Sequence, residues 1–284
     1  MKNILLPTDF SQNSFNAISY TIDMFRDEKV KFTLLHAYKV FEYYEKSMLA
    51  AQPGQQSLEK AKKEVEDELE ELKESLQEEA GKEHQFKTTT HNLLLVDAIK
   101  KELKKQKPYL ISIGTQGRTG AKEVVYGSNT LNVMEEIEKC PILAIPAHAG
   151  FKPPKEIVLA NSFKIELTSV DLEFLVGLAR KFGSAIRILH ISEEGGLNQY
   201  QHYNRKQLQE KLAEVKHSFH YLEYLSVPMG IYSFSESRGS DIIAFVNKKH
   251  SLIENMLLNP LYRNLAHFSK VPVLVLHHPQ IKKN

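Results

Sequence analysis

Short apolar runs alternate with segments of helical pattern along the chain. Residues Asn3 to Leu6, Val30 to His36 and Tyr109 to Ile113 are predominantly apolar runs of a length typical of buried strands. Residues Asn13 to Phe25 and Leu95 to Gln106 lie between such runs, and we predict that they are helical. Strands and helices that alternate at this length predict an α/β fold with a parallel, doubly wound sheet and right-handed crossovers. In such sheets, ligands bind beyond the carboxyl ends of the strands.

The longest predicted helix, Ser57 to Ala80, has an apolar stripe and an acidic surface. Residues 57–83 hold eleven Asp or Glu residues against five lysines. The simplest interpretation is a core-facing helix whose charged side chains are solvated. The alternative is a coiled-coil seam to another protein. The stripe consists of residues three or four positions apart, namely Leu58, Ala61, Val65, Leu69, Leu72 and Leu76.

The pattern restarts after a linker-like segment with one glycine and two prolines, AHAGFKPP (147–154). An internal repeat of this length predicts two tandem domains, residues 1–147 and 154–279, rather than a solenoid. Three segments of the second half align with segments of the first: Lys155–Phe163 with Lys2–Phe10, Ala185–His190 with Lys31–His36, and Lys270–Leu276 with Lys139–Ile145.

One segment of the second copy has an ambiguous pattern. By the repeat, it should form a strand at Phe219 to Leu222 and a helix that begins near Val227, with Pro228 in its first turn. Residues 231–237 (IYSFSES), however, alternate as they would in a strand. We follow the repeat and predict the helix.

Composition excludes several classes of protein. With 42% hydrophobic and 25% charged residues, the 284 residues have the composition of a soluble globular protein. No apolar run approaches the roughly 18 residues of a membrane span, and no signal-peptide pattern is present, so we expect a cytoplasmic protein without a membrane partner. The formal charge of +2 gives no support for nucleic-acid binding. The one cysteine, Cys140, excludes an internal disulfide, and its place before an apolar strand favours a buried residue over a reactive thiol.

A glycine-bearing segment follows the strand at Tyr109 to Ile113. It contains Gly114, Gly117 and Gly120, and the turn Gly127-Ser128-Asn129-Thr130 then opens a helix. Glycine lets the backbone approach a ligand closely, and the free N–H groups at a helix start favour an anion, so this segment suits phosphate. The alternative is that the glycines only permit tight turns and that Ser128 only caps the helix.

The repeat allows the two halves to be compared position by position. Asp9 aligns with Ser162, the loop Gly114–Gly117 with Val246-Asn247-Lys248-Lys249, and Gly127-Ser128 with Leu258-Asn259. The glycines of the first half are therefore replaced by residues with side chains, which occupy space that a phosphate would need. We predict that the second half keeps the fold but lacks the site, and that residues 248–250 (KKH) are a solvated basic loop.

The glycine spacing G-x2-G-x9-G-S, together with the strand-ending Pro7-Thr8-Asp9, resembles the universal stress protein family in its ATP-binding branch. The resemblance implies two Rossmann-like domains, similar to the adenine nucleotide α-hydrolases and related by a pseudo-two-fold axis. It also implies an intrachain pseudo-dimer in which Pro141 to Ile145 pairs edge to edge with Val271 to Leu276. A further homodimer of whole chains stays open.

The resemblance also implies ATP as the cofactor, with or without Mg²⁺, and no metal site built by the protein. Asp9 would accept hydrogen bonds from the ribose hydroxyls, and Ala37 would meet the adenine through its backbone. The glycine loop would line the ribose and the phosphates, and the helix start would bind the phosphates. The full set of expected binding residues is Pro7, Thr8, Asp9, Ala37, Ile113, Gly114, Gln116, Gly117, Gly127, Ser128, Asn129 and Thr130.

Several candidate residues have simpler explanations. Asp9 has an alternative role as an Asx-turn residue. His36 recurs as His190 in the half without a site, which favours a role in the fold over a role as a ligand or base. His277-His278 has no Cys, Asp or Glu at ligand spacing, so we interpret it as an exposed tail rather than a metal site.

The preferred hypothesis is a non-enzymatic, ATP-binding regulatory protein of the stress response with one nucleotide site in the first domain. One alternative is a slow ATP hydrolase, for which Asp9, Arg118 and Lys122 are the charged candidates. The other is an interaction module with a vestigial site, whose unknown protein partner would bind the acidic helix and the aromatic segment Tyr38 to Tyr44.

Overall fold

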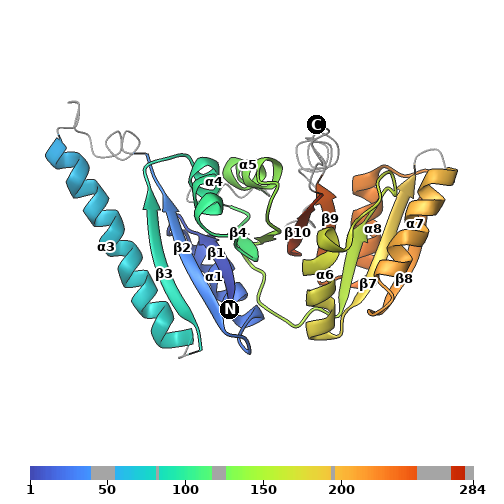
Figure 1. The fold of residues 1–284 in the computed structure, drawn as a ribbon, viewed down its shortest axis with the longest axis horizontal. Helices are drawn as coiled ribbons and strands as arrows, with labels where there is room; N and C mark the ends of the chain where they lie inside the picture. The colour runs from blue at the N-terminus through green and yellow to red at the C-terminus, as the bar shows by residue number, and fades with distance from the viewer. Residues whose placement is uncertain (40–54, 81–82, 117–125, 193–195, 248–269, 279–284) are drawn as a thin grey trace.

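The computed structural model describes residues 1–39, 55–80, 83–116, 126–192, 196–247 and 270–278, which form one large sheet flanked by helices (Figure 1). The first half contains β1 (Lys2–Pro7), α1 (Gln12–Met24), β2 (Val30–Ala37), α3 (Gln55–Ala80), β3 (Gln85–His91), α4 (Leu95–Lys105), β4 (Leu110–Gly114), α5 (Ser128–Glu136) and β5 (Ile142–Ile145). The second half contains β6 (Glu156–Ala160), α6 (Ser169–Phe182), β7 (Ala185–Ser192), α7 (Gln199–Lys211), β8 (His217–Glu223), α8 (Val227–Arg238), β9 (Ile242–Asn247) and β10 (Val273–His277).

The ten strands follow the order β3-β2-β1-β4-β5-β10-β9-β6-β7-β8, so the second half repeats the strand order of the first in reverse. Within each half, neighbouring strands are parallel. The halves join where β5 pairs antiparallel with β10, with Leu143 opposite Leu274 and Ala144 opposite Val273. The predicted α/β class, parallel sheets and edge-to-edge pairing of the fifth strands are confirmed. This pairing covers an edge that each half alone would expose.

The inner strands, such as β4 and β5, are buried on both faces, which explains why they read as continuous apolar runs, whereas the edge strands β3 and β8 are partly exposed and more polar. In β1, Ile4 and Leu6 point to one face and Leu5 to the other, because side chains alternate along a strand. The first face is covered by α1, α3, α6 and α7, and the second by α4, α5 and α8. Two apolar layers therefore enclose the sheet.

The acidic helix α3 packs against the outer part of the first half, beside β3 (Figure 1). Its residues Val65 and Leu69 are buried, whereas Asp67 and Glu68 on another face are exposed. Glu70 also accepts a hydrogen bond from the Thr88 hydroxyl of β3. The prediction of a core-facing helix with solvated charges is therefore confirmed.

The ambiguous segment 231–237 lies within α8, so the prediction from the repeat is confirmed over the alternating pattern. Pro228 occupies the first turn of this helix, where a missing N–H costs nothing. Ile231 faces the core, and Gly230 lies so close to Ile191 that a Cβ would come within 2.7 Å of it. Gly239, in the left-handed conformation with φ of 59°, ends the helix.

The segment that joins the two halves packs against both of them. The Phe151 ring lies edge-on to Tyr20 of α1 at 5.3 Å and beside Phe182 of α6 at 5.8 Å. Lys181 of α6 forms an ion pair with Glu28 of the first half at 2.5 Å. Residues 147–154, despite their linker-like composition, thus form a connection that packs against both halves.

Among the residues that the structure describes, no helix combines the length and apolar character needed to span a lipid bilayer.

Candidate functional site

The predicted site residues converge at one edge of the sheet. Pro7, Ala37 and Gly114 end β1, β2 and β4, which are adjacent strands, and the carboxyl ends of parallel strands meet at the same edge. The start of α5 reaches the same place, because the N–H of Gly127 donates to the main-chain oxygen of Thr115 at 2.7 Å. Residues far apart in sequence are thereby brought together as predicted.

The turn after β1 is built by its own side chains. The Thr8 hydroxyl accepts a hydrogen bond from the N–H of Phe10 at 3.0 Å, and Asp9 Oδ1 accepts one from the N–H of Ser11 at 3.1 Å. Phe10 has a φ of 60°, in the left-handed region. The Asx-turn proposed for Asp9 is therefore present.

The second half makes the same turn without a carboxylate. Asn161 Oδ1 accepts from the N–H of Phe163 at 2.6 Å, and Ser162 Oγ accepts from the N–H of Lys164 at 3.5 Å. Phe163 has a φ of 55°, close to that of its counterpart Phe10. Because Ser162 can stand where Asp9 stands, the turn alone does not require a negative charge.

Gly114 is held against α1 by close packing. A Cβ at this position would lie 2.8 Å from Oδ1 and 2.9 Å from the main-chain oxygen of Asn13, distances that real Cβ atoms essentially never show. The packing of α1 against the end of β4 therefore requires glycine at this position.

Asn13 was not among the predicted site residues; it is buried and lies one turn before Ala17 on the buried side of α1. Its Oδ1 accepts from the N–H of Gln116 at 2.5 Å, and its Nδ2 donates to the main-chain oxygen of Ile145 at 3.2 Å. A polar residue at a core-facing helix position was the signal that could have identified it.

Helix α5 begins with an exposed first turn. Its N-cap is Gly127, and no side chain caps it, so the alternative that Ser128 only caps the helix is wrong. Ser128 and Asn129 are exposed, and the first helical hydrogen bond comes from the N–H of Leu131 to Gly127 at 3.1 Å. The N–H groups that precede this bond are the ones that a helix start offers to an anion.

Thr130 joins two elements of the predicted site. Its side chain is buried, and its hydroxyl donates to the main-chain oxygen of Gly114 at 2.8 Å. The hydroxyl proton is thus used to join α5 to the end of β4. In this arrangement the hydroxyl proton is used within the protein, because a hydroxyl has one proton to donate, and the expected contact of Thr130 with phosphate stays a prediction for its main-chain N–H.

His36 and His190 occupy equivalent places with equivalent contacts. His36 Nδ1 lies 2.8 Å from the main-chain oxygen of Thr8, and His190 Nδ1 lies 3.0 Å from that of Asn161. Each ring also packs on the phenylalanine of the adjacent turn, with ring centroids 4.6 and 5.2 Å apart. The prediction that this histidine belongs to the fold is confirmed.

The exposed-tail interpretation of His277-His278 is wrong. His277 ends β10, and burial lowers the pKa of its imidazole to about 4. His278 Nδ1 lies 2.7 Å from Oδ2 of the buried Asp171 in α6. Across the described segments, no group of three or more His, Cys, Asp or Glu residues could hold a metal ion.

Cys140 is buried as predicted, and its thiol donates to the main-chain oxygen of Pro108 at 3.2 Å. Burial raises the pKa of the thiol well above its ordinary value, so the reactive thiolate is disfavoured.

In the second half, helix α7 covers the turn that corresponds to the Asp9 turn. Gln201 Nε2 donates to the main-chain oxygen of Ser162 at 2.8 Å, and Asn204 Nδ2 donates to that of Phe163 at 2.8 Å. Both side chains are buried. Besides lacking the carboxylate, the second half thus has two side chains of α7 hydrogen-bonded to the main chain of this turn.

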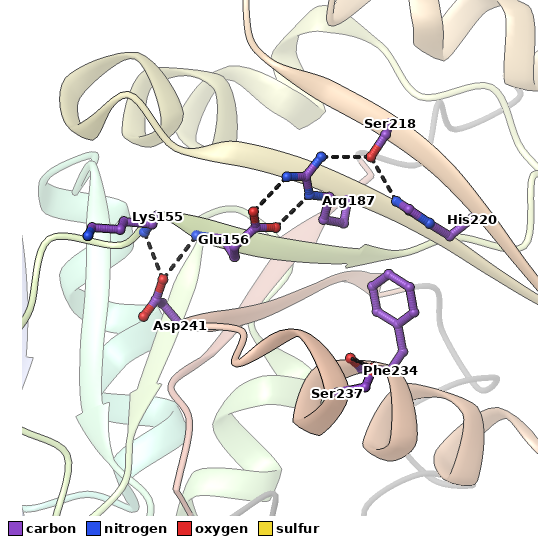
Figure 2. A network of polar contacts seen from close by, with 8 residues as sticks. All are labelled: Lys155, Glu156, Arg187, Ser218, His220, Phe234, Ser237 and Asp241. Atoms are coloured by element: carbon purple, nitrogen blue, oxygen red, sulfur yellow. Dashed lines mark hydrogen bonds and ion pairs between the residues drawn. The ribbon is translucent and has the colours of Figure 1, made fainter.

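A second polar cluster lies at the opposite end of the strands in this half (Figure 2). Arg187 binds both carboxylate oxygens of Glu156, at 2.5 and 2.6 Å, and also Ser218 Oγ at 2.9 Å, which in turn lies 2.7 Å from His220 Nε2. The hydrogen bonds from Arg187 hold the pKa of the Glu156 carboxyl below its usual range, while burial lowers that of His220. The cluster joins three adjacent strands, and we interpret it as structural.

Some residues of the sequence prediction lie outside the described segments. They are Gly117, Gly120, Arg118 and Lys122 in the first half, and the aligned Lys248–His250 and Leu258-Asn259 in the second, together with most of the aromatic segment after Lys39.

With this geometry established, the chain was compared with known proteins. The model of the universal stress protein family matches residues 1–146. The chain belongs to the universal stress protein family. The match covers every predicted site residue and ends directly after β5, so in the second half of this universal stress protein the likeness to the first is the repeated strand order of the sheet. A search of curated proteins found no match.

Three solved structures share the fold over nearly the whole chain. A universal stress protein from Archaeoglobus fulgidus DSM 4304 has a TM-score of 0.67 and 18% identity over 98% of this chain and 97% of that one. A putative universal stress protein from Pseudomonas aeruginosa UCBPP-PA14 has a TM-score of 0.55 and 12% identity over 98% and 93%. The cytoplasmic domain of a prokaryotic cation chloride cotransporter has a TM-score of 0.52 and 13% identity over 97% and 95%. At these identities the likeness concerns the fold alone.

Proposed function

We propose that this universal stress protein binds one adenine nucleotide, ATP, in its first half, and that it acts in the cytoplasm as a regulator in the stress response rather than as an enzyme. The observation that carries the proposal is the difference between two equivalent turns. The first half has a carboxylate, Asp9, in a turn that the second half forms with Ser162, on which Gln201 is packed. A carboxylate in a turn that also forms without one is a candidate for binding, because it adds a charged hydrogen-bond acceptor.

The residues at this edge fit the parts of a nucleotide. The Asp9 carboxylate is an acceptor suited to the two ribose hydroxyls, and Ala37, the last residue of β2, would meet the adenine through its main chain. The exposed first turn of α5, at Ser128 and Asn129, offers N–H groups and the positive end of the helix dipole to the phosphates. Mg²⁺ would be held chiefly by phosphate oxygens and water.

One feature supports binding without fast turnover. Within the described residues, no group of three or more His, Cys, Asp or Glu side chains could hold a metal ion for a metal-assisted reaction, and Asp9 belongs to no such cluster. An ATP hydrolase would instead release ADP steadily in the presence of Mg²⁺. A variant Arg118→Ala that abolished such release without loss of binding would assign the protein to that class.

Calorimetric titration with ATP tests the proposal on two matched variants. Asp9→Ser installs the residue that the second half already uses in the same turn, so it removes the charge and preserves the local fold. A hydrogen bond to a charged group contributes about 1.5–3 kcal/mol, so we expect a roughly ten- to hundredfold loss of ATP affinity. The control Ser162→Ala should bind ATP as the wild type does. Absence of ATP binding by the wild type, or equal affinity of Asp9→Ser, would refute the proposal.

A further inference from the structure

Asn13 lies at the junction of the two sides of the proposed site. It occupies the first turn of α1, the helix that follows directly on the Asp9 turn, and its side chain points away from solvent with 6% of the residue exposed. Its polar atoms contact two other elements of the site, the loop after β4 and the end of β5. Asn13 therefore joins segments that are more than a hundred residues apart in sequence.

Both ends of the Asn13 amide are engaged. Oδ1 accepts from the main-chain N–H of Gln116 at 2.5 Å, at the start of the glycine loop. Nδ2 donates to the main-chain oxygen of Ile145, the last residue of β5, at 3.2 Å. The Ile145 oxygen also accepts from the N–H of Thr115 at 3.0 Å. The three bonds form a closed link that fixes Thr115 and Gln116 relative to β5.

Gly114 connects Asn13 to helix α5. Gly114 lies against Asn13 with no room for a Cβ, and the Gly114 oxygen receives the Thr130 hydroxyl at 2.8 Å. Thr130 in turn belongs to the first turn of α5, whose neighbouring N–H groups face the proposed phosphates. Asn13 and the first turn of α5 thus both contact Gly114, so a shift of Asn13 would also shift the end of α5 that faces the proposed phosphates.

We propose that Asn13 is a positioning residue for the phosphate side of the nucleotide site, which it holds in register with the ribose side at Asp9. This inference rests on the proposed function and deepens it. Asn13 needs no contact with the nucleotide. It sets the direction of the Gln116 main chain, so its loss should weaken the hold on the phosphates more than the hold on the nucleoside.

The same helix supplies a matched control. Asn16 is one turn further along α1, and its Nδ2 also donates to main-chain oxygens after β5, those of Pro146 at 2.9 Å and Ala149 at 3.1 Å. These oxygens belong to the connection between the halves and not to the glycine loop. Asn16→Ala therefore removes the same chemical group from the same helix without touching Gln116.

The experiment compares the affinities for ATP and adenosine in the wild type, Asn13→Ala, Asn13→Leu and Asn16→Ala. Leucine fills the volume of asparagine without its hydrogen bonds, so it separates the loss of the link from the creation of a cavity. We expect both Asn13 variants to lose at least tenfold in ATP affinity while adenosine affinity changes less than threefold, and Asn16→Ala to bind both as the wild type does. Unchanged ATP affinity in the Asn13 variants, or equal losses for ATP and adenosine, would overturn the inference.

If the Asn13 variants do not fold, the inference is tested on the wild type instead, by measuring amide hydrogen exchange in the absence of nucleotide. The amide of Gln116 should exchange slowly, because its proton is donated to a buried acceptor. Exchange at the rate of an open loop would overturn the inference. A wild type that binds no ATP but protects this amide would refute the proposed function while leaving the link intact, so the two failures are distinguishable.

Discussion

The side-chain amide of Gln201 donates a hydrogen bond of 2.8 Å to the main-chain oxygen of Ser162, the residue that stands in the second half where Asp9 stands in the first. Asn204, one turn further along α7, binds the next carbonyl in the same way. The loss of the carboxylate is thus accompanied by a helix packed on the turn. Two independent changes in one place support a single nucleotide site per chain.

The contact between Gly114 and Asn13 predicts that one added methyl group at Gly114 lowers the stability of the fold. Gly114→Ala would place a Cβ within 2.8–2.9 Å of Asn13, and overpacking of this kind costs about 1–3 kcal/mol. The free energy of unfolding, measured by urea denaturation, should fall by that amount. Gly150→Ala is the control, because a Cβ there meets nothing within 4 Å. Equal stability of the two variants would contradict this account of the packing.

The Glu156–Arg187 pair predicts a dependence of stability on pH. Hydrogen bonds from Arg187 lower the pKa of the Glu156 carboxyl below its unfolded value, so the pair stabilises the fold above the unfolded pKa of about 4.3. This contribution is lost as the pH falls through the folded pKa. Glu156→Gln should therefore be less stable than the wild type at pH 7 by roughly 1–2 kcal/mol.

The difference in urea-unfolding free energy between Glu156→Gln and the wild type should shrink as the pH is lowered below about 4.3, since the wild-type carboxyl then becomes protonated as well. Arg187→Met should show the same trend. A difference that stays constant from pH 7 into this acid range would mean that the charge of Glu156 does not contribute.

The antiparallel pair of β5 and β10 predicts the behaviour of the isolated first half. In the full chain, Leu143 and Ala144 pair with Leu274 and Val273. A fragment of residues 1–147 would expose this edge of β5, and an open apolar edge favours pairing with another strand. Light scattering after size exclusion should therefore give the mass of a dimer. A fragment that remains monomeric at micromolar concentration would contradict the prediction.

The sequence predicted most strands and helices of the first half from their apolar pattern, and the repeat of that pattern predicted β6, β7, β8, α8 and β10 of the second half; α6, α7 and β9 were not predicted. It placed the helix at 227–238 correctly only because the repeat outweighed the local alternation of IYSFSES. The fifth-strand pairing was predicted from a resemblance and from the apolar, short character of both strands.

The polar contacts of the site were less accessible from the sequence. The link from Asn13 to Gln116 joins residues 103 positions apart, and no local pattern specifies such a pair. The hydrogen bond from the Thr130 hydroxyl to the main-chain oxygen of Gly114 could not be predicted either, since a hydroxyl near a helix start can bind a ligand as well as a neighbouring carbonyl. The contact of His278 with the buried Asp171 depends on the packing of β10 against α6, which a tail-like sequence does not reveal.

The most direct test of one nucleotide site per chain is a count. The protein is saturated with ATP, separated from excess nucleotide by gel filtration, and denatured. The released nucleotide is then identified by chromatography, and its amount is divided by that of the protein. We predict close to one adenine nucleotide per chain in the wild type and close to none in Asp9→Ser. Two nucleotides per chain, or none in the wild type even when ATP is present throughout the filtration, would contradict the account.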